Sequence, residues 1–298
     1  PDRGGLMPEV EGQTAETGLA FAQSHCEGLV RDGDPDRYYA TLFAPAAARP
    51  HLFALYAFSL TIARVREAVS NPMAGEIRLQ WWRDALQGEA RGDVRANPVA
   101  AALEETIRAN RLGRQPFVDL IDARVFDLYE DPMPRMNDLE GYCGETASAL
   151  FRLASLVIGN GTEPGGAGAA GHAGVAYGIA GLLRALPWHA RSGQVYLPAD
   201  ILGRYGVTRE DIVTGRGGPG LRRACADLRG IARQHLKAFE AARPTIAPSA
   251  GAAFLPVALV EPYLAAMERS SYDPLNTLVE LPRWRRLWRL WRAARRVG

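Results

Sequence analysis

Lysine is almost absent from this sequence, because Lys237 is the only one and all the other basic residues are arginines. Arginine keeps its charge when buried and makes bidentate contacts with carboxylates and phosphates. The positive and negative charges nearly balance, and the net charge of +2 is too small to indicate binding to nucleic acid. No nucleic-acid partner is therefore expected.

Cysteine is also scarce. The three cysteines, Cys26, Cys143 and Cys225, are far apart, and no two of them have CxxC spacing. This favours neither a zinc site nor a disulfide framework and is typical of a reducing compartment. The Gly-x-Ser-x-Gly and HExxH patterns of common hydrolases and zinc enzymes are missing as well.

Long hydrophobic runs are missing too. No apolar run approaches the length of a membrane-spanning helix, and the N-terminal residues lack the basic-then-apolar pattern of a signal peptide. We therefore expect a cytoplasmic protein that is soluble or at most peripheral at the inner face of the membrane.

Helical patterning fills most of the chain. With 298 residues, 47% of them hydrophobic and 23% charged, the chain suits one large helical domain. Residues 1–15 are rich in glycine, proline and acids and predict a flexible lead-in to a single domain over 16–298. Apolar spacing and Pro or Gly boundaries predict helices over 17–31, 50–70, 75–87, 117–130, 139–159, 171–186, 221–242, 251–269 and 281–296, and one opening at Asn97-Pro98.

Two helical segments contain charged residues that are candidates for a functional site. Helix 50–70 is apolar along one face and ends in Arg64, Arg66 and Glu67. In the second segment, Gly174, Gly178 and Gly181 would allow another backbone or a ligand to approach closely, and Arg184 follows on the same face. A buried arginine needs a carboxylate or an anionic ligand, so Arg184 is the leading candidate of this segment.

Pro187 is predicted to break that second helix, next to Trp188, His189 and Arg191. His189 titrates in a range that suits proton transfer, although a lone histidine is more often an ordinary surface or core residue.

The C-terminal segment 281–296 predicts a basic helix. Trp284, Trp288 and Trp291 recur at helical spacing among many arginines, including Arg285 and Arg289. Such a helix can lie in a membrane interface and pair with anionic headgroups, or contact a partner protein. Alternatively, the tryptophan stripe caps the core of the bundle while the arginines face water.

Four stretches resemble the squalene/phytoene synthase family, in matching order and separation. They are RYYATLFAPAAARPHLFALYAF (37–58), EIRLQWWRDAL (76–86), LIDARVFDL (120–128) and RSGQVYLPADILGRYGV (191–207). The resemblance implies an all-α isoprenoid-synthase-type bundle with a central cavity. In active members, it further implies two aspartate motifs that hold Mg²⁺ and two prenyl diphosphates.

The aspartate motifs of that family are replaced in this chain. Where the first motif has Asp-Asp-x-x-Asp, this sequence has Ala63, Arg64, Val65, Arg66 and Glu67. Where the second has Arg-Asp-x-x-x-Asp, it has Arg184 followed by Ala185 and, four residues later, His189. Mg²⁺ prefers oxygen ligands, which these residues do not supply. The replacements resemble the branch of the family that contains the respiratory complex I assembly factor of mitochondria, which is thought to be non-catalytic.

The resemblance leaves two functions open. The first is a non-catalytic protein that binds a prenyl lipid or assists the assembly of a respiratory complex. It needs no cofactor, and its partners would be a prenyl lipid or diphosphate, a membrane-protein subunit or a membrane surface. The second is an active prenyl diphosphate transferase with a non-standard site, which would require Mg²⁺ and use Arg184, His189 or Tyr196 in catalysis. For either function, the expected ligand-binding residues are Tyr38, Tyr56, Arg64, Glu67, Tyr177, Gly178, Gly181, Arg184 and Arg191.

Overall fold

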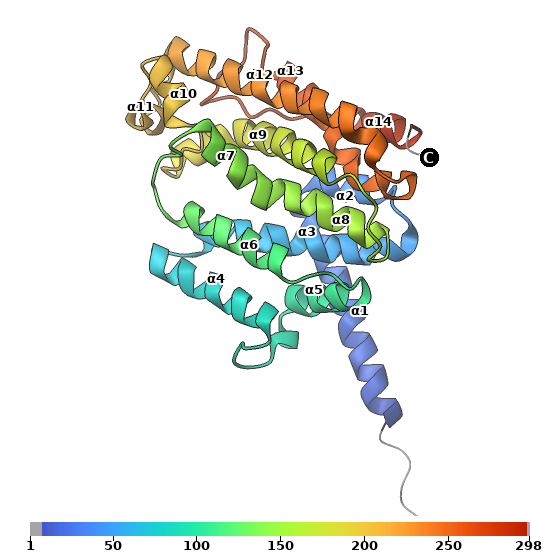
Figure 1. Cartoon of the computed structure of the whole chain (residues 1–298). Helices are drawn as coiled ribbons and strands as arrows, with labels where there is room; N and C mark the ends of the chain where they lie inside the picture. Colours follow the sequence, from blue (N-terminus) through green and yellow to red (C-terminus); the bar gives the residue numbers. More distant parts are fainter. Residues whose placement is uncertain (1–7, 297–298) are drawn as a thin grey trace, which may run out of the picture.

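The chain folds into a bundle of α-helices, and a computed structural model describes residues 8–296, with side chains from residue 17 onward (Figure 1). The described residues contain no strand, only an isolated bridge between Gly165 and Ile246. The α-helices are α1 (Pro8–Gly33), α2 (Pro35–Thr41), α3 (Arg49–Ala63), α4 (Pro72–Gln87), α5 (Pro98–Ala109), α6 (Gln115–Ala123), α7 (Met136–Cys143), α8 (Ala149–Ile158), α9 (Ala167–Arg191), α10 (Ala199–Arg204), α11 (Arg209–Val213), α12 (Gly218–Ala242), α13 (Val260–Ala266) and α14 (Arg283–Ala294).

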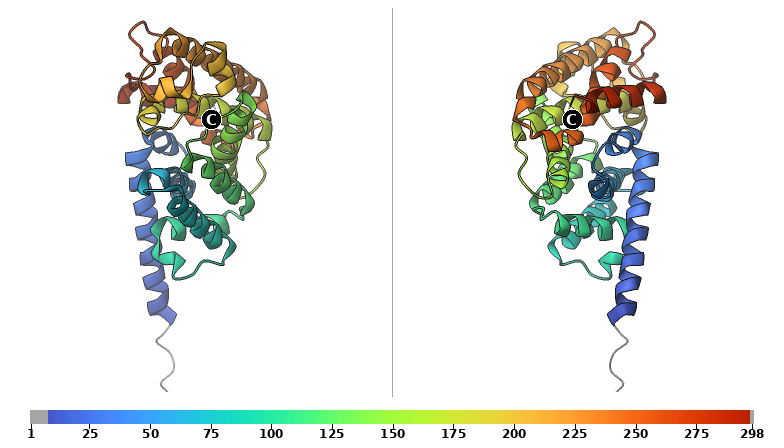
Figure 2. Two further views of the ribbon diagram at one scale, coloured as in Figure 1. Left: turned by 90° about the vertical axis from the view of Figure 1, so that its left-hand side faces the viewer. Right: turned by 90° about the vertical axis from the view of Figure 1, so that its right-hand side faces the viewer.

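Helices far apart in sequence lie side by side in the bundle. Helix α3 packs against α1 and α5, and α9 packs along α12. Helix α14 returns to the N-terminal part of the chain and contacts α2. Figure 2 shows that the first turns of α1 project beyond the rest of the bundle.

Local sequence signals begin and end several of these helices. The side chain of Asn71 accepts a hydrogen bond from the Ala74 amide at 3.0 Å, and Pro72 follows at the first helical position, so α4 begins there. Gly88 ends α4 with φ of 80°, a conformation that glycine adopts without strain. Asn97 caps α5 in the same way as Asn71 caps α4.

The prediction that Pro187 breaks its helix is wrong. Helix α9 runs on through Pro187 to Arg191. A proline inside a helix removes one hydrogen bond and costs about 3 kcal/mol. Pro187, the preceding Leu186 and Ala190 one turn later are buried, and this packing offsets the local cost.

Other helix boundaries differ from the predicted ones. Helix α3 ends at Ala63, and Arg66–Ala68 form a separate 3₁₀ turn. The predicted helix 139–159 contains a π-helical stretch, Gly144–Ser148. The first part of the predicted helix 251–269 belongs to a 3₁₀ helix, Pro248–Leu259, and α13 follows it. Helix α1 already includes residues 8–15, which we expected to be a flexible lead-in, while residues 1–7 of that lead-in lie outside the described residues.

Two clusters of buried apolar side chains form the core. One lies around α3, α5 and α8, the other around α9, α12 and α13, and Tyr177, Leu236 and Ala252 pack on both. Contrary to our expectation from the sequence, Pro248–Ala266 is long and apolar enough, by length and composition, to cross a membrane, but 67% of its most apolar stretch is buried inside the bundle. Its place in the core therefore accounts for its apolar composition.

Candidate functional site

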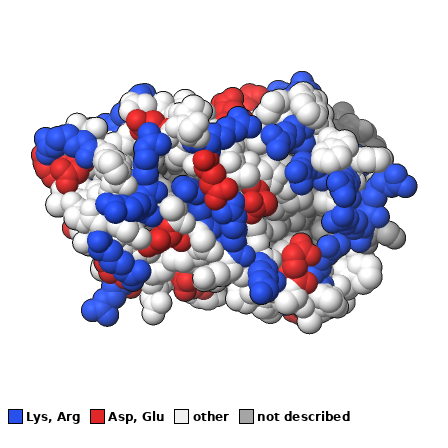
Figure 3. Space-filling view, turned by 90° about the horizontal axis from the view of Figure 1, so that it is seen from above, with Lys and Arg blue, Asp and Glu red and all other residues white. Residues whose placement is uncertain are grey.

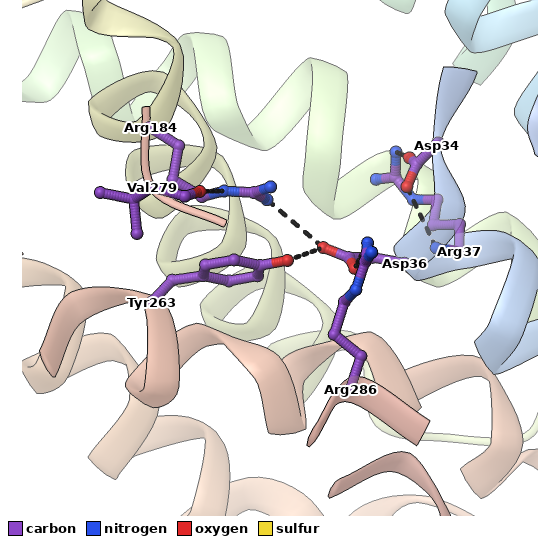
Figure 4. A network of polar contacts seen from close by, with 7 residues as sticks. All are labelled: Asp34, Asp36, Arg37, Arg184, Tyr263, Val279 and Arg286. Atoms are coloured by element: carbon purple, nitrogen blue, oxygen red, sulfur yellow. Dashed lines mark hydrogen bonds and ion pairs between the residues drawn. The ribbon is translucent and has the colours of Figure 1, made fainter. Parts of the chain in front are cut away.

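A buried carboxylate, Asp36, joins three parts of the chain (Figure 4). Asp36 lies in the first turn of α2 and is 3% exposed. It accepts hydrogen bonds from the Tyr263 hydroxyl of α13 at 2.7 Å, from Arg184 of α9 at 3.3 Å and from Arg286 of α14 at 3.2 Å. The guanidinium of Arg184 also stacks on the Tyr263 ring at 3.6 Å. We call Asp36, Arg184, Tyr263 and Arg286 the Asp36 cluster.

Asp34 positions this carboxylate by starting α2. Its side chain accepts a hydrogen bond from the Arg37 amide at 3.0 Å, and Pro35 follows it at the first helical position. The sequence Asp32-Gly33-Asp34-Pro35 predicts only a turn. The local sequence does not distinguish Asp36, which follows this turn and is buried, from Asp32, which is exposed. The sequence analysis therefore missed Asp36.

Arg37 lies between α3 and α9. Its guanidinium is 5.2 Å from the centre of the Tyr56 ring and 4.8 Å from that of Tyr177, and it pairs with Asp34 at 3.0 Å. Burial raises the pKa of Tyr56 to about 12, so this hydroxyl stays protonated at neutral pH. Tyr56 and Tyr177 were predicted to bind a ligand, and in the structure both rings pack on this internal arginine.

A small cavity of about 260 Å³ opens beside the Asp36 cluster. Ligand pockets commonly measure about 300–1,000 Å³, so this one is small for a long prenyl chain. Of the predicted ligand-binding residues, Tyr177, Gly181 and Arg184 line it. The structure therefore brings together only part of the predicted set.

The residues that replace the first aspartate motif do not line the cavity beside the Asp36 cluster. Arg64 lines a different cavity of about 420 Å³, together with Arg78, Trp81 and Trp82. Glu67 is exposed and lines neither cavity. Outside both cavities, Arg191 is exposed at the end of α9, Tyr38 stacks on Phe53, and Gly178 packs on Cys143.

A second buried carboxylate, Asp127, lies beside the C-terminal end of α9, beyond Arg184. It accepts hydrogen bonds from the hydroxyls of Tyr142 at 2.8 Å and Tyr196 at 2.9 Å, and it pairs with Arg124 at 2.9 Å. The His189 ring packs 4.7 Å from that of Tyr196. His189 and Tyr196, two of the three candidate catalytic residues, are thus part of this network and do not line the cavity beside Arg184.

The environment of His189 keeps its imidazole neutral. Burial lowers its pKa to about 4, although the nearby Asp127 acts in the opposite direction. Its Nδ1 is buried and has no hydrogen-bond partner. A base with this pKa is weak at neutral pH, so the site does not favour His189 as a general base.

The three glycines of α9 differ in what surrounds them. A Cβ at Gly174 would lie 2.2 Å from backbone atoms of Ser148, and one at Gly178 would lie 2.7 Å from the Cys143 sulfur. A Cβ at Gly181 would have nothing within 4 Å. Close backbone approach explains Gly174 but not Gly181.

The pair Gly174→Ala and Gly181→Ala tests this difference. We expect Gly174→Ala to lower the free energy of unfolding by about 2 kcal/mol, because the Ser148 backbone has to move. Gly181→Ala should raise it by up to about 1 kcal/mol, since alanine favours the helix. Urea unfolding of both variants measures the two changes, and equal changes of the same sign would contradict the packing at Gly174.

Helix α14 docks through residues other than the tryptophans. Leu290 is fully buried, whereas Trp284, Trp288 and Trp291 are 70%, 44% and 47% exposed. The alternative in which the tryptophan stripe caps the core is therefore wrong. Leu290 and Arg286 hold the helix on the bundle and leave the tryptophans on its outer face, with Arg289 partly buried beside them.

The residues at the positions of the two aspartate motifs do not fit a Mg²⁺ ion. Asp36 and Asp127 are the only buried carboxylates among the described residues, and arginine and tyrosine side chains already bind both. No group of three or more His, Cys, Asp or Glu side chains in the described part could hold a metal ion. An Asp36 oxygen could become a metal ligand only if its arginine contacts were broken.

The profile of the family described as squalene/phytoene synthase matches residues 30–292. The chain belongs to the squalene/phytoene synthase family. A relative in this family is the human NADH dehydrogenase (ubiquinone) complex I, assembly factor 6, which is 29% identical over 95% of this chain and 88% of its own length.

Enzymes of the squalene/phytoene synthase family match as well. Presqualene diphosphate synthase from Rhodopseudomonas palustris is 29% identical over 68% of this chain and 72% of its own. The crystal structure of squalene synthase HpnC from Alicyclobacillus acidocaldarius superimposes with a TM-score of 0.69 at 26% identity, covering 86% of this chain and 96% of that one. The predicted all-α isoprenoid-synthase fold is thereby confirmed.

Proposed function

We propose that this chain acts by binding, as an assembly factor for a membrane-bound respiratory NADH dehydrogenase, and not by Mg²⁺-dependent prenyl transfer. The Asp36 cluster is the observation that carries the proposal. At the end of α9 where active family members place metal-binding aspartates, Arg184 is held by a carboxylate that also binds Arg286 and Tyr263. The similarity to the human assembly factor, over nearly the whole of both chains, supports the same role.

A prenyl diphosphate transferase with a non-standard site is the alternative. It is favoured by the cavity beside the Asp36 cluster, where Arg184 and Arg286 could bind a phosphate group. The same two arginines already bind Asp36, however, so a diphosphate would have to compete with a buried carboxylate. Arginines alone would also replace the metal ions that stabilise the leaving diphosphate in metal-dependent enzymes.

Deletion of the gene in its host separates the two functions. We expect the deletion strain to lose assembled NADH dehydrogenase, measured on native gels and as NADH:quinone activity of isolated membranes. Re-expression of the chain should restore both. The purified chain with Mg²⁺ and farnesyl or geranylgeranyl diphosphate should release no pyrophosphate, and stoichiometric Mg²⁺-dependent turnover would overturn the proposal.

Association with the inner face of the membrane is part of the same proposal. The exposed tryptophans of α14 and the surrounding arginines give this helix the composition of an interfacial helix. Figure 3 shows arginines gathered at the right-hand end of the upper face, the end at which Figure 1 places α14. A membrane contact there would bring the chain close to the membrane-embedded subunits that an assembly factor serves.

A further inference from the structure

A groove lies between α14 and the helices beneath it, away from the Asp36 cluster. Its volume is about 760 Å³, which makes it larger than the cavity of about 260 Å³ beside that cluster. It is formed by the end of α12, the 3₁₀ helix Pro248–Leu259 and the second half of α14. No residue lines both spaces.

The floor of the groove is hydrocarbon. Phe239 and Phe254 stack at 5.8 Å, and Ile246, Leu255 and Val257 continue this surface. Phe254 is only 6% exposed, so the floor lies well below the molecular surface. Such a surface suits an alkyl chain, which loses its contact with water on binding.

The rim of the groove is basic. Arg243, Arg289, Arg292 and Arg296 line it together with two glutamates, Glu240 and Glu261. Both glutamates already have arginine partners, because Glu240 pairs with Arg243 at 3.4 Å and Glu261 pairs with Arg233 at 2.9 Å.

The three groove arginines of α14 and the turn after it have no carboxylate partner among the described residues. Arg289, Arg292 and Arg296 form no ion pair with a carboxylate within the described residues. The Nε of Arg289 is buried and lacks a hydrogen-bond partner. A buried donor without a partner is costly, and an anionic oxygen would satisfy it.

We propose that this groove binds one molecule of an anionic phospholipid, with an acyl chain on the Phe239–Phe254 floor and the phosphate among Arg289, Arg292 and Arg296. The arginines without carboxylate partners complement an anionic headgroup, and the apolar floor fits an acyl chain. The exposed Trp288 and Trp291 on the outer face of the same helix would bring the groove to the headgroup layer. The proposal concerns lipid binding by the purified chain and is independent of the proposed assembly role.

Two double charge variants test the site. The purified full chain is incubated with phosphatidylglycerol vesicles, separated from them by gel filtration and examined by native mass spectrometry. We expect one bound lipid per chain after incubation with phosphatidylglycerol vesicles and none after incubation with phosphatidylcholine vesicles.

Arg292→Gln with Arg296→Gln should reduce the bound fraction about tenfold, because charge-assisted contacts to the phosphate are lost. Arg91→Gln with Arg95→Gln removes the same charge from exposed residues that line no part of the groove, and should retain the lipid.

A third variant tests the hydrocarbon floor while keeping every charge. Ala258 lines the groove, and Ala258→Trp should fill part of it and abolish the lipid adduct, while co-sedimentation with the vesicles persists. Added glycerol phosphate should not displace the lipid, whereas displacement would identify a simple phosphate site. Equal loss in both double variants, or an adduct that survives Ala258→Trp, would overturn the proposal.

Discussion

Replacing Asp36 by alanine should lower the free energy of unfolding by about 3 kcal/mol, among the largest effects expected for a single substitution in this protein. The substitution leaves Arg184, Arg286 and the Tyr263 hydroxyl without their shared acceptor. Removing one partner of a buried ion pair costs about 3–5 kcal/mol, and the lower end applies because both arginines keep partial access to water. Urea unfolding followed by circular dichroism measures the change.

Asp32→Ala is the matched control for this experiment. Asp32 is a near neighbour in sequence, but its side chain is 78% exposed and contacts only Arg31. Exposed pairs contribute little, so this variant should unfold within about 0.5 kcal/mol of the wild type. Arg286→Met should have an intermediate effect, because Asp36 keeps Arg184 and Tyr263. If Asp36→Ala and Asp32→Ala unfold alike, the cluster does not hold α2, α9, α13 and α14 together.

The second large effect is a dependence of stability on pH that originates at His189. In the folded protein, burial holds its pKa at about 4, whereas in the unfolded chain the pKa is about 6.5. Between these values the unfolded chain binds a proton that the folded protein does not. Stability is therefore unaffected by His189 above about pH 6.5 and falls as the pH decreases toward 4, by on the order of 3 kcal/mol in total.

His189→Phe should remove this component. Phenylalanine keeps a ring against Tyr196 and removes the unpartnered Nδ1. Urea unfolding of the variant and the wild type at several pH values from 7 to 4 measures the difference between them. The two proteins should differ by a constant amount above pH 6.5 and diverge below it, with the wild type losing more stability. Curves that stay parallel down to pH 4 would show that His189 titrates normally in the folded protein.

The residues at the second motif position thus contact two different buried carboxylate networks. Arg184 belongs to the Asp36 cluster at one point of α9, and His189 packs beside the Asp127 network farther along it. A carboxylate introduced at position 189 would lie near the buried Asp127, and two like charges in a poorly hydrated site repel each other. Restoring the aspartates of active family members would therefore disturb the fold as well as the site.

Several features could be predicted because they are local. Asn97-Pro98 predicted the start of α5, and apolar spacing predicted helices across the bundle, although the predicted start of α4 at residue 75 misses the cap at Asn71. Ordered stretches such as 37–58 and 191–207 identified the family, since matched residues at matched separations hardly arise by chance. The loss of the aspartates at positions 63, 64, 185 and 189 can also be read from the sequence alone.

Other features could not be predicted because they depend on contacts between distant residues. Pro187 favours a helix end locally, and only burial keeps α9 intact there. The sequence offers Asp32, Asp34 and Asp36 as equivalent acids, and the return of α14 to α2 is what makes Asp36 the buried one.

The chemical composition of the motif segments, and with it the lack of metal ligands there, was determined by the sequence itself. The tertiary structure decided how the charged residues of those segments are paired. A buried arginine requires an acceptor wherever it lies, but which acid meets it depends on how the helices pack. In this fold, Asp36 meets Arg184 and Arg286, Asp127 meets Arg124, and the tryptophans of α14 remain exposed.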